Sequence, residues 1–455
     1  MQARRLFIAA AAALLASSAA LAQVPATKAA PGAGPQPGQR LVVDINGGIS
    51  QPMPIAIPAM PTPQVNRTEA GSTDALGRQV AEVVTNDLKG SGLFKPVSAS
   101  HPVAFPQVTA PEYDYWSTTG ASALVQGFVQ ANNDGTLTVG CYLYDVYAKQ
   151  ELTRQGFVVK PADWRRAAHK CADTVYTRLT GEGPYFDSRV VYVSETGPKN
   201  HRTKRLAIMD QDGANHRFLT NGQSIVLTPR FAPNQQEIVY MSYVGNRPRI
   251  YTYEIGSGRQ HLVVSSPNMT FAPRFSPDGR YIVYSMSTGA NTQIYRIPTS
   301  GGAPVRLTSA PGINTAPCYS PDGSKIVFES DRSGGQQIYV MNADGSNQHR
   351  ISFGPGRHAT PVWSPRGDLI AFTRIGGGFD VGVMAPDGSG ERILTHGWQD
   401  EGPTWSPNGR VIMFFRTAQG SGHTSLWSID LTGVNERHIP TPLDGSDPAW
   451  GPLRP

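Results

Sequence analysis

Side chains that could do chemistry are present in this chain, but they do not form a catalytic pattern. The Asp-Gln-Asp-Gly segment at 210–213 begins like a calcium loop, yet position twelve is Asn221 rather than a bidentate glutamate, which favours a turn. The adjacent acids Asp400 and Glu401 could act as acid and base, but neighbours on one loop do not straddle a substrate by default. Neither segment by itself predicts a reaction.

The histidines and the nucleophile motifs give the same result. The chain has no Gly-x-Ser-x-Gly elbow and no His-Glu-x-x-His helix motif. Eight histidines never fall at metal-ligand spacing, and none has a nearby cysteine or carboxylate pair of a known metal-binding type; they are His201, His216, His261, His349, His358, His396, His423 and His438. The sequence therefore predicts a protein that is not an enzyme and has no cofactor and no metal site.

Composition narrows the class of fold. The chain has 455 residues with 48 Gly, 38 Pro and only 16% charged residues, together with 17 Tyr, 16 Phe and 7 Trp. Gly and Pro are well above average usage but below the low-complexity range, which indicates many turns around an ample core. Past the N-terminal end, no apolar run approaches the roughly 18 to 20 residues that cross a membrane. Collagen, coiled coil and membrane bundle are excluded, and a turn-rich protein that is not membrane-embedded is expected.

The first 39 residues are predicted to be a leader and a tether. Arg4 and Arg5 precede an apolar run, and a small-x-small site ends at Ala22 before Gln23, which is typical of a cleaved signal peptide over 1–22. An uncleaved anchor is the alternative. Residues 23–39 are mainly Pro, Gly, Ala and Gln and indicate a disordered tether.

Charge gives no support to nucleic-acid binding. The formal net charge of +6 falls to +4 when Arg4 and Arg5 leave with the leader, and no run of Lys or Arg occurs. The three cysteines are few for an exported protein. Cys141 and Cys171 could pair if their strand and helix pack together, and independent buried thiols are an equal alternative.

The strongest signal is a repeat. A segment that combines Pro, an aromatic residue and a Ser-Pro-Asp-Gly type of turn recurs six times, with its aromatic residues 44, 44, 44, 42 and 45 positions apart. A period in the forties built from short alternating strands is the mark of a β-propeller with one four-stranded blade per repeat. The aromatic residues are Phe231, Phe275, Tyr319, Trp363, Trp405 and Trp450.

The two ends of the repeat array are halves of one blade. The array begins at 189–194 with a second-strand pattern that lacks a first strand, and it ends at 449–452 with a first strand that nothing follows. We therefore expect the C-terminal strand to pair with 189–194 and to close a six-bladed ring, which removes the free edges. The propeller is assigned to 187–455.

Residues 40–186 do not share this period and predict a separate α/β N-terminal domain. Leu76, Val80, Val83, Val84 and Leu88 recur at helical spacing between a Ser-Thr cap and a Gly stop. Strands are expected at 41–46, 54–58, 123–130 and 136–147, and a second helix at about 163–179. The domain has a normal size for one core.

The leader, the α/β domain, the junction Arg-Leu-Thr-Gly-Glu-Gly-Pro-Tyr-Phe-Asp-Ser-Arg-Val-Val-Tyr-Val-Ser at 178–194 and the sixfold repeat together resemble the TolB family of the Tol-Pal system. The resemblance covers the chain beyond residue 40. It implies a periplasmic binding protein and a monomer, which contacts the lipoprotein Pal through the propeller and TolA through the mature N-terminal region. It also implies a role in outer-membrane constriction during division and in envelope integrity, further partners among other envelope proteins, and exploitation by toxins and phages.

The mature end departs from the family pattern. It opens with the 23–39 tether rather than directly with the first strand, so the TolA contact could fall on the tether or on that strand. The residues of the strand are Leu41, Val42, Val43, Asp44, Ile45 and Asn46.

One propeller face is predicted to bind the partner. The turns after each first strand are nearly uniform, whereas the loops that lead into first strands and join second to third strands vary, as an asymmetric partner requires. Arginines in four repeats would give this face a positive rim for an acidic protein, although they could instead pair with neighbours. The predicted contact residues are Arg247, Arg249, Thr270, Asn314, Arg332, His358, Arg374, Asp400, Glu401 and Arg416.

Two rival functions remain for a propeller. A lid on a serine hydrolase would need a further hydrolase domain of about 250 residues, for which the chain outside the repeats has too little length. A periplasmic propeller enzyme or small-ligand-binding protein would use the central channel and needs His, Asp or Arg side chains that converge from the inner strands. The inner strands carry Pro and aromatic residues instead, which favours the binding protein.

Overall fold

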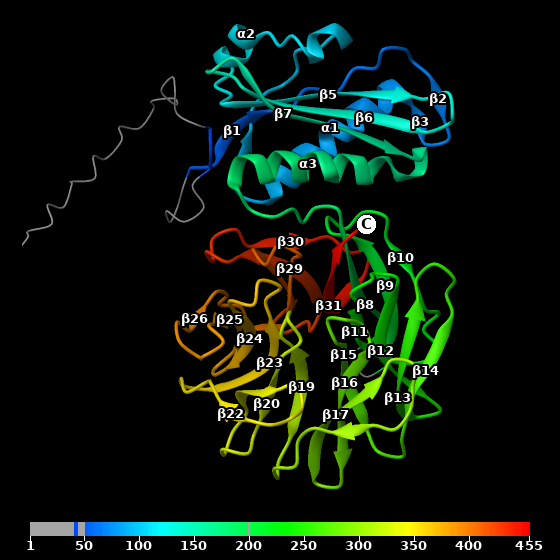
Figure 1. Ribbon diagram of the computed structural model, residues 1–455, viewed down its shortest axis with the longest axis vertical. Coiled ribbons are helices and arrows are strands. Elements are labelled where there is room, and N and C mark those ends of the chain that lie inside the picture. Colours follow the sequence, from blue (N-terminus) through cyan, green and yellow to red (C-terminus); the bar gives the residue numbers. More distant parts are fainter. Residues whose placement is uncertain (1–40, 44–50, 199–200) are drawn as a thin grey trace, which may run out of the picture.

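A computed structural model describes residues 41–43, 51–198 and 201–455. The predicted leader, its cleavage site at Ala22 and Gln23, the tether, and Asp44, Ile45 and Asn46 lie outside the described residues. The described part divides into an N-terminal group of helices and strands and a large β-propeller (Figure 1). This confirms the predicted order of the two kinds of structure.

The N-terminal part is a five-stranded sheet in the order β4-β1-β5-β6-β7. The strand β1 is parallel to both neighbours, whereas β5, β6 and β7 form an antiparallel meander. Helices α1 and α3 cover the sheet face that is turned toward the propeller, and α2 lies on the other side (Figure 1). Its elements are β1 Met53–Ala56, β2 Arg67–Thr68, β3 Gly71–Ser72, α1 Thr73–Gly90, β4 Phe94–Pro96, η1 Phe105–Val108, α2 Tyr113–Thr118, β5 Ala123–Ala131, β6 Leu137–Asp145, β7 Gln150–Val159, η2 Pro161–Asp163 and α3 Trp164–Thr180.

The periodic apolar residues predicted for the first helix all point into the core. Leu76, Val80, Val83, Val84 and Leu88 are buried on α1, as an amphipathic helix against a sheet requires. The predicted second helix corresponds to α3. No strand is assigned at 41–43, where the Val43 N–H donates to the Leu179 carbonyl at 2.8 Å instead.

One disulfide joins the sheet to α3. Cys141 on β6 is bonded to Cys171 on α3, with their Cα atoms 5.7 Å apart. Of the two alternatives left open by the sequence, the structure therefore has the paired one. Cys318 is a buried free thiol in the propeller.

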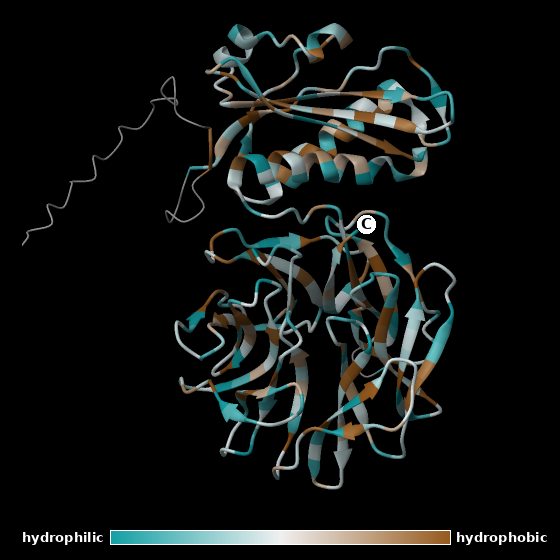
Figure 2. Ribbon diagram, in the orientation of Figure 1, coloured by the Kyte–Doolittle hydropathy of each residue, from teal (hydrophilic) through white to brown (hydrophobic). Residues whose placement is uncertain are grey.

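The propeller consists of short, mainly antiparallel sheets whose strands contain both hydrophobic and hydrophilic stretches (Figure 2). Three of its sheets have four strands from consecutive segments: β11 Val226–Phe231, β12 Glu237–Val244, β13 Arg247–Glu254 and β14 Gln260–Ser265; β15 Thr270–Phe275, β16 Tyr281–Thr288, β17 Asn291–Pro298 and β18 Val305–Arg306; β19 Asn314–Tyr319, β20 Lys325–Ser330, β21 Gln337–Asn342 and β22 His349–Arg350.

The next sheet has eight strands. Within it, each of two four-strand groups pairs antiparallel in sequence order, and a single parallel pair, Phe379 with Gln399, joins them. Its strands are β23 Arg357–Trp363, β24 Ile370–Ile375, β25 Phe379–Met384, β26 Arg392–Ile393, β27 Gln399–Trp405, β28 Val411–Thr417, β29 Thr424–Asp430 and β30 Arg437–Ile439.

The remaining sheet joins the two ends of the repeat array, as predicted. Its order is β10-β9-β8-β31, so the C-terminal strand β31 (Asp444–Leu453) pairs antiparallel with β8 (Ser188–Thr196), followed by β9 (Thr203–Asp210) and β10 (Arg217–Phe218). Trp450 lies opposite Val190, and its indole N–H donates to the Ser188 hydroxyl at 2.8 Å. The chain closes its ring without a covalent bond.

The first strands of the repeats share one irregularity. In each of them a register shift leaves one residue in the left-handed region, with φ between 48° and 63°, directly before the repeat proline. Such a bulge bends the strand and re-aims the side chain that follows the proline. The bulge residues are Thr228, Ala272, Ala316, Thr360, Gly402 and Asp447.

The N-terminal part packs on one face of the propeller, which we call the turn face because it carries the Ser-Pro-Asp-Gly turns and the turns between third and fourth strands. The Asn408 side chain donates to the Gly183 carbonyl, and that of Asn435 to the Gly90 carbonyl, both at 2.8 Å. Core residues of both parts, including Tyr185 and Trp450, belong to one hydrophobic cluster. The opposite face is free of these contacts among the residues described.

Candidate functional site

The face opposite the N-terminal part is the candidate binding surface, and we call it the mouth. Antiparallel pairing within each sheet places the loop that leads into a first strand beside the loop that joins the second and third strands. Thus the Ile225 carbonyl accepts the Tyr243 N–H, and the Met269 carbonyl accepts the Ser287 N–H, both at 2.9 Å. Each pair of loops forms one sector of the mouth.

Large apolar side chains are exposed on the mouth at repeated positions. Five of these residues come directly before the first strand of a repeat. The other one, Phe353, lies four residues before the first strand β23. Exposed apolar surface gathered in one place marks an interaction site more often than scattered single residues do. We call these residues the apolar ring; they are Ile225, Met269, Ile313, Phe353, Trp398 and Leu443, between 38% and 72% exposed.

The apolar ring was not predicted from the sequence. The repeated pattern lies after each proline, whereas the ring residues precede the first strand, where no single residue type occurs in all six repeats. The signal that could have found five of them is an apolar residue four or five positions before the repeat proline, outside the period-two alternation of the strands; Phe353 lies eight positions before its proline.

Two arginines of the predicted positive rim form ion pairs with neighbouring acids. Arg374 pairs with Asp380 at 2.7 Å, and Arg416 pairs with Asp400 at 2.6 Å and Glu436 at 2.8 Å. The hydrogen bonds that Arg416 donates to Asp400 and Glu436 raise the pKa of Arg416. Arg374 and Arg416 therefore hold the loops together, as in the alternative of pairing with neighbours, and a partner contact by the rim stays a prediction.

Arg332 has a similar role with neutral partners. Its guanidinium donates to the Ser330 hydroxyl at 2.9 Å and the Gln348 amide oxygen at 2.8 Å, and also reaches Asn314. It lies 4.9 Å from the centre of the Tyr339 ring, where a cation is stabilised by the aromatic face. The acid suggested as its neighbour, Asp331, accepts the Ile313 N–H instead.

The other predicted contact residues fall into two groups. Thr270, Asn314, His358 and Asp400 are fully buried and support the loops from below; His358, for example, contacts Glu391 at 3.1 Å. Arg247 is exposed and Arg249 is half-buried. The predicted contacts that remain accessible stay predictions for a partner surface.

Glu401 does not lie on the rim but lines the central channel. It borders a chamber of about 120 Å³ on the mouth side, together with Asp447. Burial and the neighbouring Asp447 raise the pKa of Glu401 to about 7. Asp400 and Glu401 are thus divided between a buried ion pair and the channel, in keeping with the argument that these neighbours do not form an acid-base pair.

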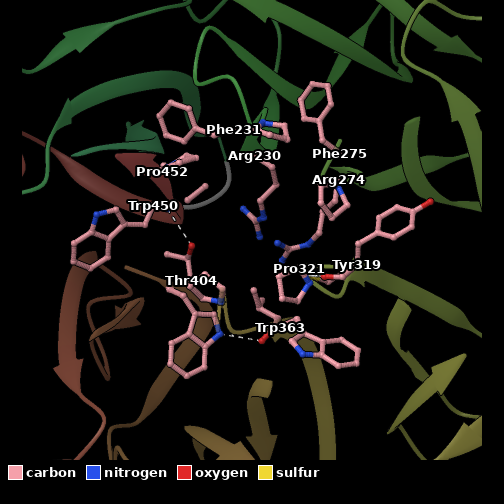
Figure 3. A pocket seen from close by; sticks show the side chains of 18 of the residues that line it. Arg230, Phe231, Arg274, Phe275, Tyr319, Pro321, Trp363, Thr404, Trp450 and Pro452 are labelled. Carbon is pink, nitrogen blue, oxygen red and sulfur yellow. Dashed lines mark hydrogen bonds between the residues drawn. The ribbon is translucent and has the colours of Figure 1, made fainter. Parts of the chain in front are cut away.

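A larger chamber of about 490 Å³ opens from the channel toward the turn face. The aromatic residues of the repeats and the prolines two positions after them surround it, and Arg230 and Arg274 point into its middle (Figure 3). The expectation that inner strands carry only Pro and aromatic residues overlooked these two arginines. Both stand between the proline and the aromatic residue of their repeats, so their position on the inner strands follows from the sequence.

A polar network lies between the N-terminal part and the propeller. The Nδ1 atom of His169 on α3 is 2.6 Å from an Asp87 carboxylate oxygen on α1, and the Gln211 side chain donates to the other oxygen of Asp87 at 2.8 Å. Burial alone would lower the pKa of His169, but Asp87, together with the charges of Asp212 and Asp210, raises this pKa to about 9. The imidazolium and Asp87 therefore form an ion pair at the junction.

The acidic segment at 210–213 belongs to this junction and forms a turn, as predicted. The Gly213 N–H donates to the Asp210 carbonyl at 3.0 Å, Arg165 pairs with Asp212, and Arg454 pairs with Asp210. Among the described residues, one group could hold a metal ion, with ligand atoms of Asp87, His169 and Asp212 within 4.8 Å of one another. Of the two acids in this group, Asp87 already pairs with His169 and Asp212 already pairs with Arg165.

These features define a class of protein in which an α/β domain precedes and packs against a β-propeller closed by its own C-terminal strand. The family description "TolB beta propeller domain" matches residues 176–454, and "TolB amino-terminal domain" matches residues 41–152. The chain belongs to the TolB family. None of the helices in the described parts of the chain has both the length and the apolarity needed to span a membrane.

Curated relatives and a solved structure agree with this assignment. The chain is 79% identical to the Tol-Pal system protein TolB of Zymomonas mobilis, covering 91% of each chain, and 77% identical to that of Rhizorhabdus wittichii, covering 91% of this chain and 95% of the relative. The crystal structure of TolB from Acinetobacter baumannii superposes with a TM-score of 0.77 at 27% identity, over 91% of this chain and all of the other.

Proposed function

We propose that this protein is a non-enzymatic adaptor of the Tol-Pal system in the periplasm. In this proposal the mouth of the propeller binds the lipoprotein Pal, and the mature N-terminal region binds TolA, in support of outer-membrane constriction during division and of envelope integrity. Family membership supports the system, and the observation that carries the adaptor role is the apolar ring on the face that the N-terminal part leaves free.

The proposal includes six blades and the domain limits expected from the sequence. The eight-stranded sheet counts as two blades, because only the pair Phe379 with Gln399 joins its halves. The limits are a leader at 1–22, a tether at 23–39, an α/β domain at 40–186 and the propeller at 187–455. The bond between Cys141 and Cys171 supports an exported protein, since disulfides persist in oxidising compartments.

Substitutions in the apolar ring test the Pal site. Phe353→Asp combined with Trp398→Asp is expected to weaken binding of purified Pal by at least about tenfold, because buried aromatic anchors carry much of the affinity of an interface. Val434→Asp is the matched control, since Val434 is 60% exposed in the turn between the third and fourth strands of its sheet. Isothermal titration with all three proteins measures the effect. Equal affinities would place the Pal site elsewhere.

Two truncations test the TolA site. Removal of 23–46 from the mature protein is expected to abolish TolA binding in a pull-down while Pal binding survives, because the mouth lies on the face away from the N-terminal part. Removal of 23–39 alone separates the tether from Leu41–Asn46, whose Leu41 and Val43 are buried against the domain. If the longer truncation lost both partners equally, the two-ended arrangement would be wrong.

The alternative is an enzyme or small-ligand-binding protein that uses the central channel. It would be favoured if neither the mature protein nor the propeller retained a protein partner from an envelope extract.

A further inference from the structure

The channel carries two positive charges at positions that the repeat makes equivalent. Arg230 on β11 lies opposite Val239, and Arg274 on β15 lies opposite Val283, in the same register after the bulge. The corresponding residues of the other first strands are neutral: Cys318, Val362, Thr404 and Ala449. The fold therefore does not require an arginine at this position, and the two that occur stand on adjacent sheets.

Neither guanidinium forms a salt bridge with an acid among the described residues, although the charge of Asp447 acts on Arg230 from the mouth side of the channel. Arg230 donates to its neighbouring Pro229 carbonyl at 2.7 Å, and within residues 51–198 and 201–455 Arg274 forms no hydrogen bond or ion pair. Burial and the charge of Arg274 lower the pKa of Arg230 to about 9. Two like charges thus face each other in a partly desolvated channel, an arrangement that a bound anion would relieve.

The surroundings define the side from which an anion would come. Both arginines border the 490 Å³ chamber toward the turn face and the 120 Å³ chamber toward the mouth. The mouth-side chamber contains Glu401 and Asp447, which repel anions, whereas the described residues that line the larger chamber include no Asp or Glu. The larger chamber is the favourable approach for a negative group.

We propose that Arg230 and Arg274 bind a small oxyanion in the central channel, approached from the turn-face chamber. A carboxylate or a phosphate offers paired oxygens that match the fork of a guanidinium. The prolines and aromatic residues around the arginines leave room for a short apolar carrier of that group. The site is distinct from the mouth, and this inference goes beyond the adaptor function.

The test titrates the mature protein with inorganic phosphate and, separately, with succinate, at constant ionic strength in sodium chloride. Saturable heat of binding is expected with at least one anion, and a rise of the unfolding temperature with the same anion. A stronger response to phosphate assigns a phosphate ligand, and a stronger response to succinate assigns a carboxylate.

Substitutions at the two arginines decide the case. Arg230→Val and Arg274→Val copy the residue type of Val362 and are expected to weaken anion binding at least tenfold while raising the unfolding temperature in the absence of anion. Arg274→Lys keeps the charge and is expected to retain part of the affinity. Arg247→Val, an exposed arginine of the mouth, is the control and is expected to bind normally.

The inference is overturned if neither anion gives saturable heat, or if the heat persists in both valine variants. Pal binding measured on the same preparations keeps this outcome separate from failure of the adaptor proposal, because the apolar ring and the arginine pair lie in different parts of the propeller.

Discussion

Trp450→Ala is expected to lower the free energy of unfolding by about 3–5 kcal/mol, the usual cost of removing a buried Trp side chain. Trp450 is 7% exposed, its indole N–H donates to Ser188, and its backbone N–H donates to the Thr404 hydroxyl at 3.0 Å. It also belongs to the hydrophobic cluster shared with the N-terminal part. Loss of the side chain weakens the closure strand and the domain junction together. Urea unfolding followed by circular dichroism measures the change.

Trp398→Ala is the matched control, because this tryptophan is 48% exposed on a loop. Its unfolding curve is expected to stay within about 0.5 kcal/mol of the wild type, as surface substitutions usually do. Equal stability of the Trp450 variant and the wild type would show that the Trp450 side chain does not stabilise the closure of the ring.

His169→Leu is expected to lower the free energy of unfolding by about 3–5 kcal/mol, because it leaves a buried carboxylate without its cationic partner. The side chain of Asp87 is almost fully buried, and the variant would retain only the Gln211 hydrogen bond. His423→Leu is the control, since His423 pairs with Asp444 at a side-chain exposure of 72%, where an ion pair contributes little.

The same pair predicts a pH dependence. The pKa of His169 rises from 6.5 to about 9 on folding. The contribution of this histidine to folding stability is therefore fully present below pH 6.5 and is lost as pH rises through about 9. The difference in unfolding free energy between wild type and His169→Leu is therefore expected to shrink between pH 6.5 and pH 9. A constant difference over this range would mean that the histidine is neutral in the folded protein.

The sequence predicted the elements that repeat and missed the contacts that do not. The propeller, its closing strand and α1 follow from period and alternation, which are local patterns. The ion pair of Asp87 with His169 joins residues 82 positions apart on two helices, and the Gln211 contact comes from the propeller. Such pairs depend on how two domains pack, which no local pattern specifies.

The candidate site shows the same division. The face was chosen from loop variation, and the arginines on it were correctly located, but Asp380 and Glu436, which neutralise Arg374 and Arg416, come from other strands or loops of the same sheet. Arg230 and Arg274 lie within the repeated motif, between its proline and its aromatic residue. The proline and aromatic positions define the motif, so the variable position between them does not by itself predict a site. The direction of the two arginines into the channel is set by the bulge before each proline, which requires backbone geometry rather than residue type.

The position of β8 has a mechanical consequence. This strand follows the linker from the α/β domain, begins at the turn face, and is hydrogen-bonded along both edges to β9 and β31. A pulling force between that domain and a partner held at the mouth would run along β8, so it would load the bonds of both ladders at once in shear. Arg454, beside Asp187 and Asp210, fastens the end of β31 at the point where the load enters. The strand that closes the ring is therefore also part of the element that transmits tension through it.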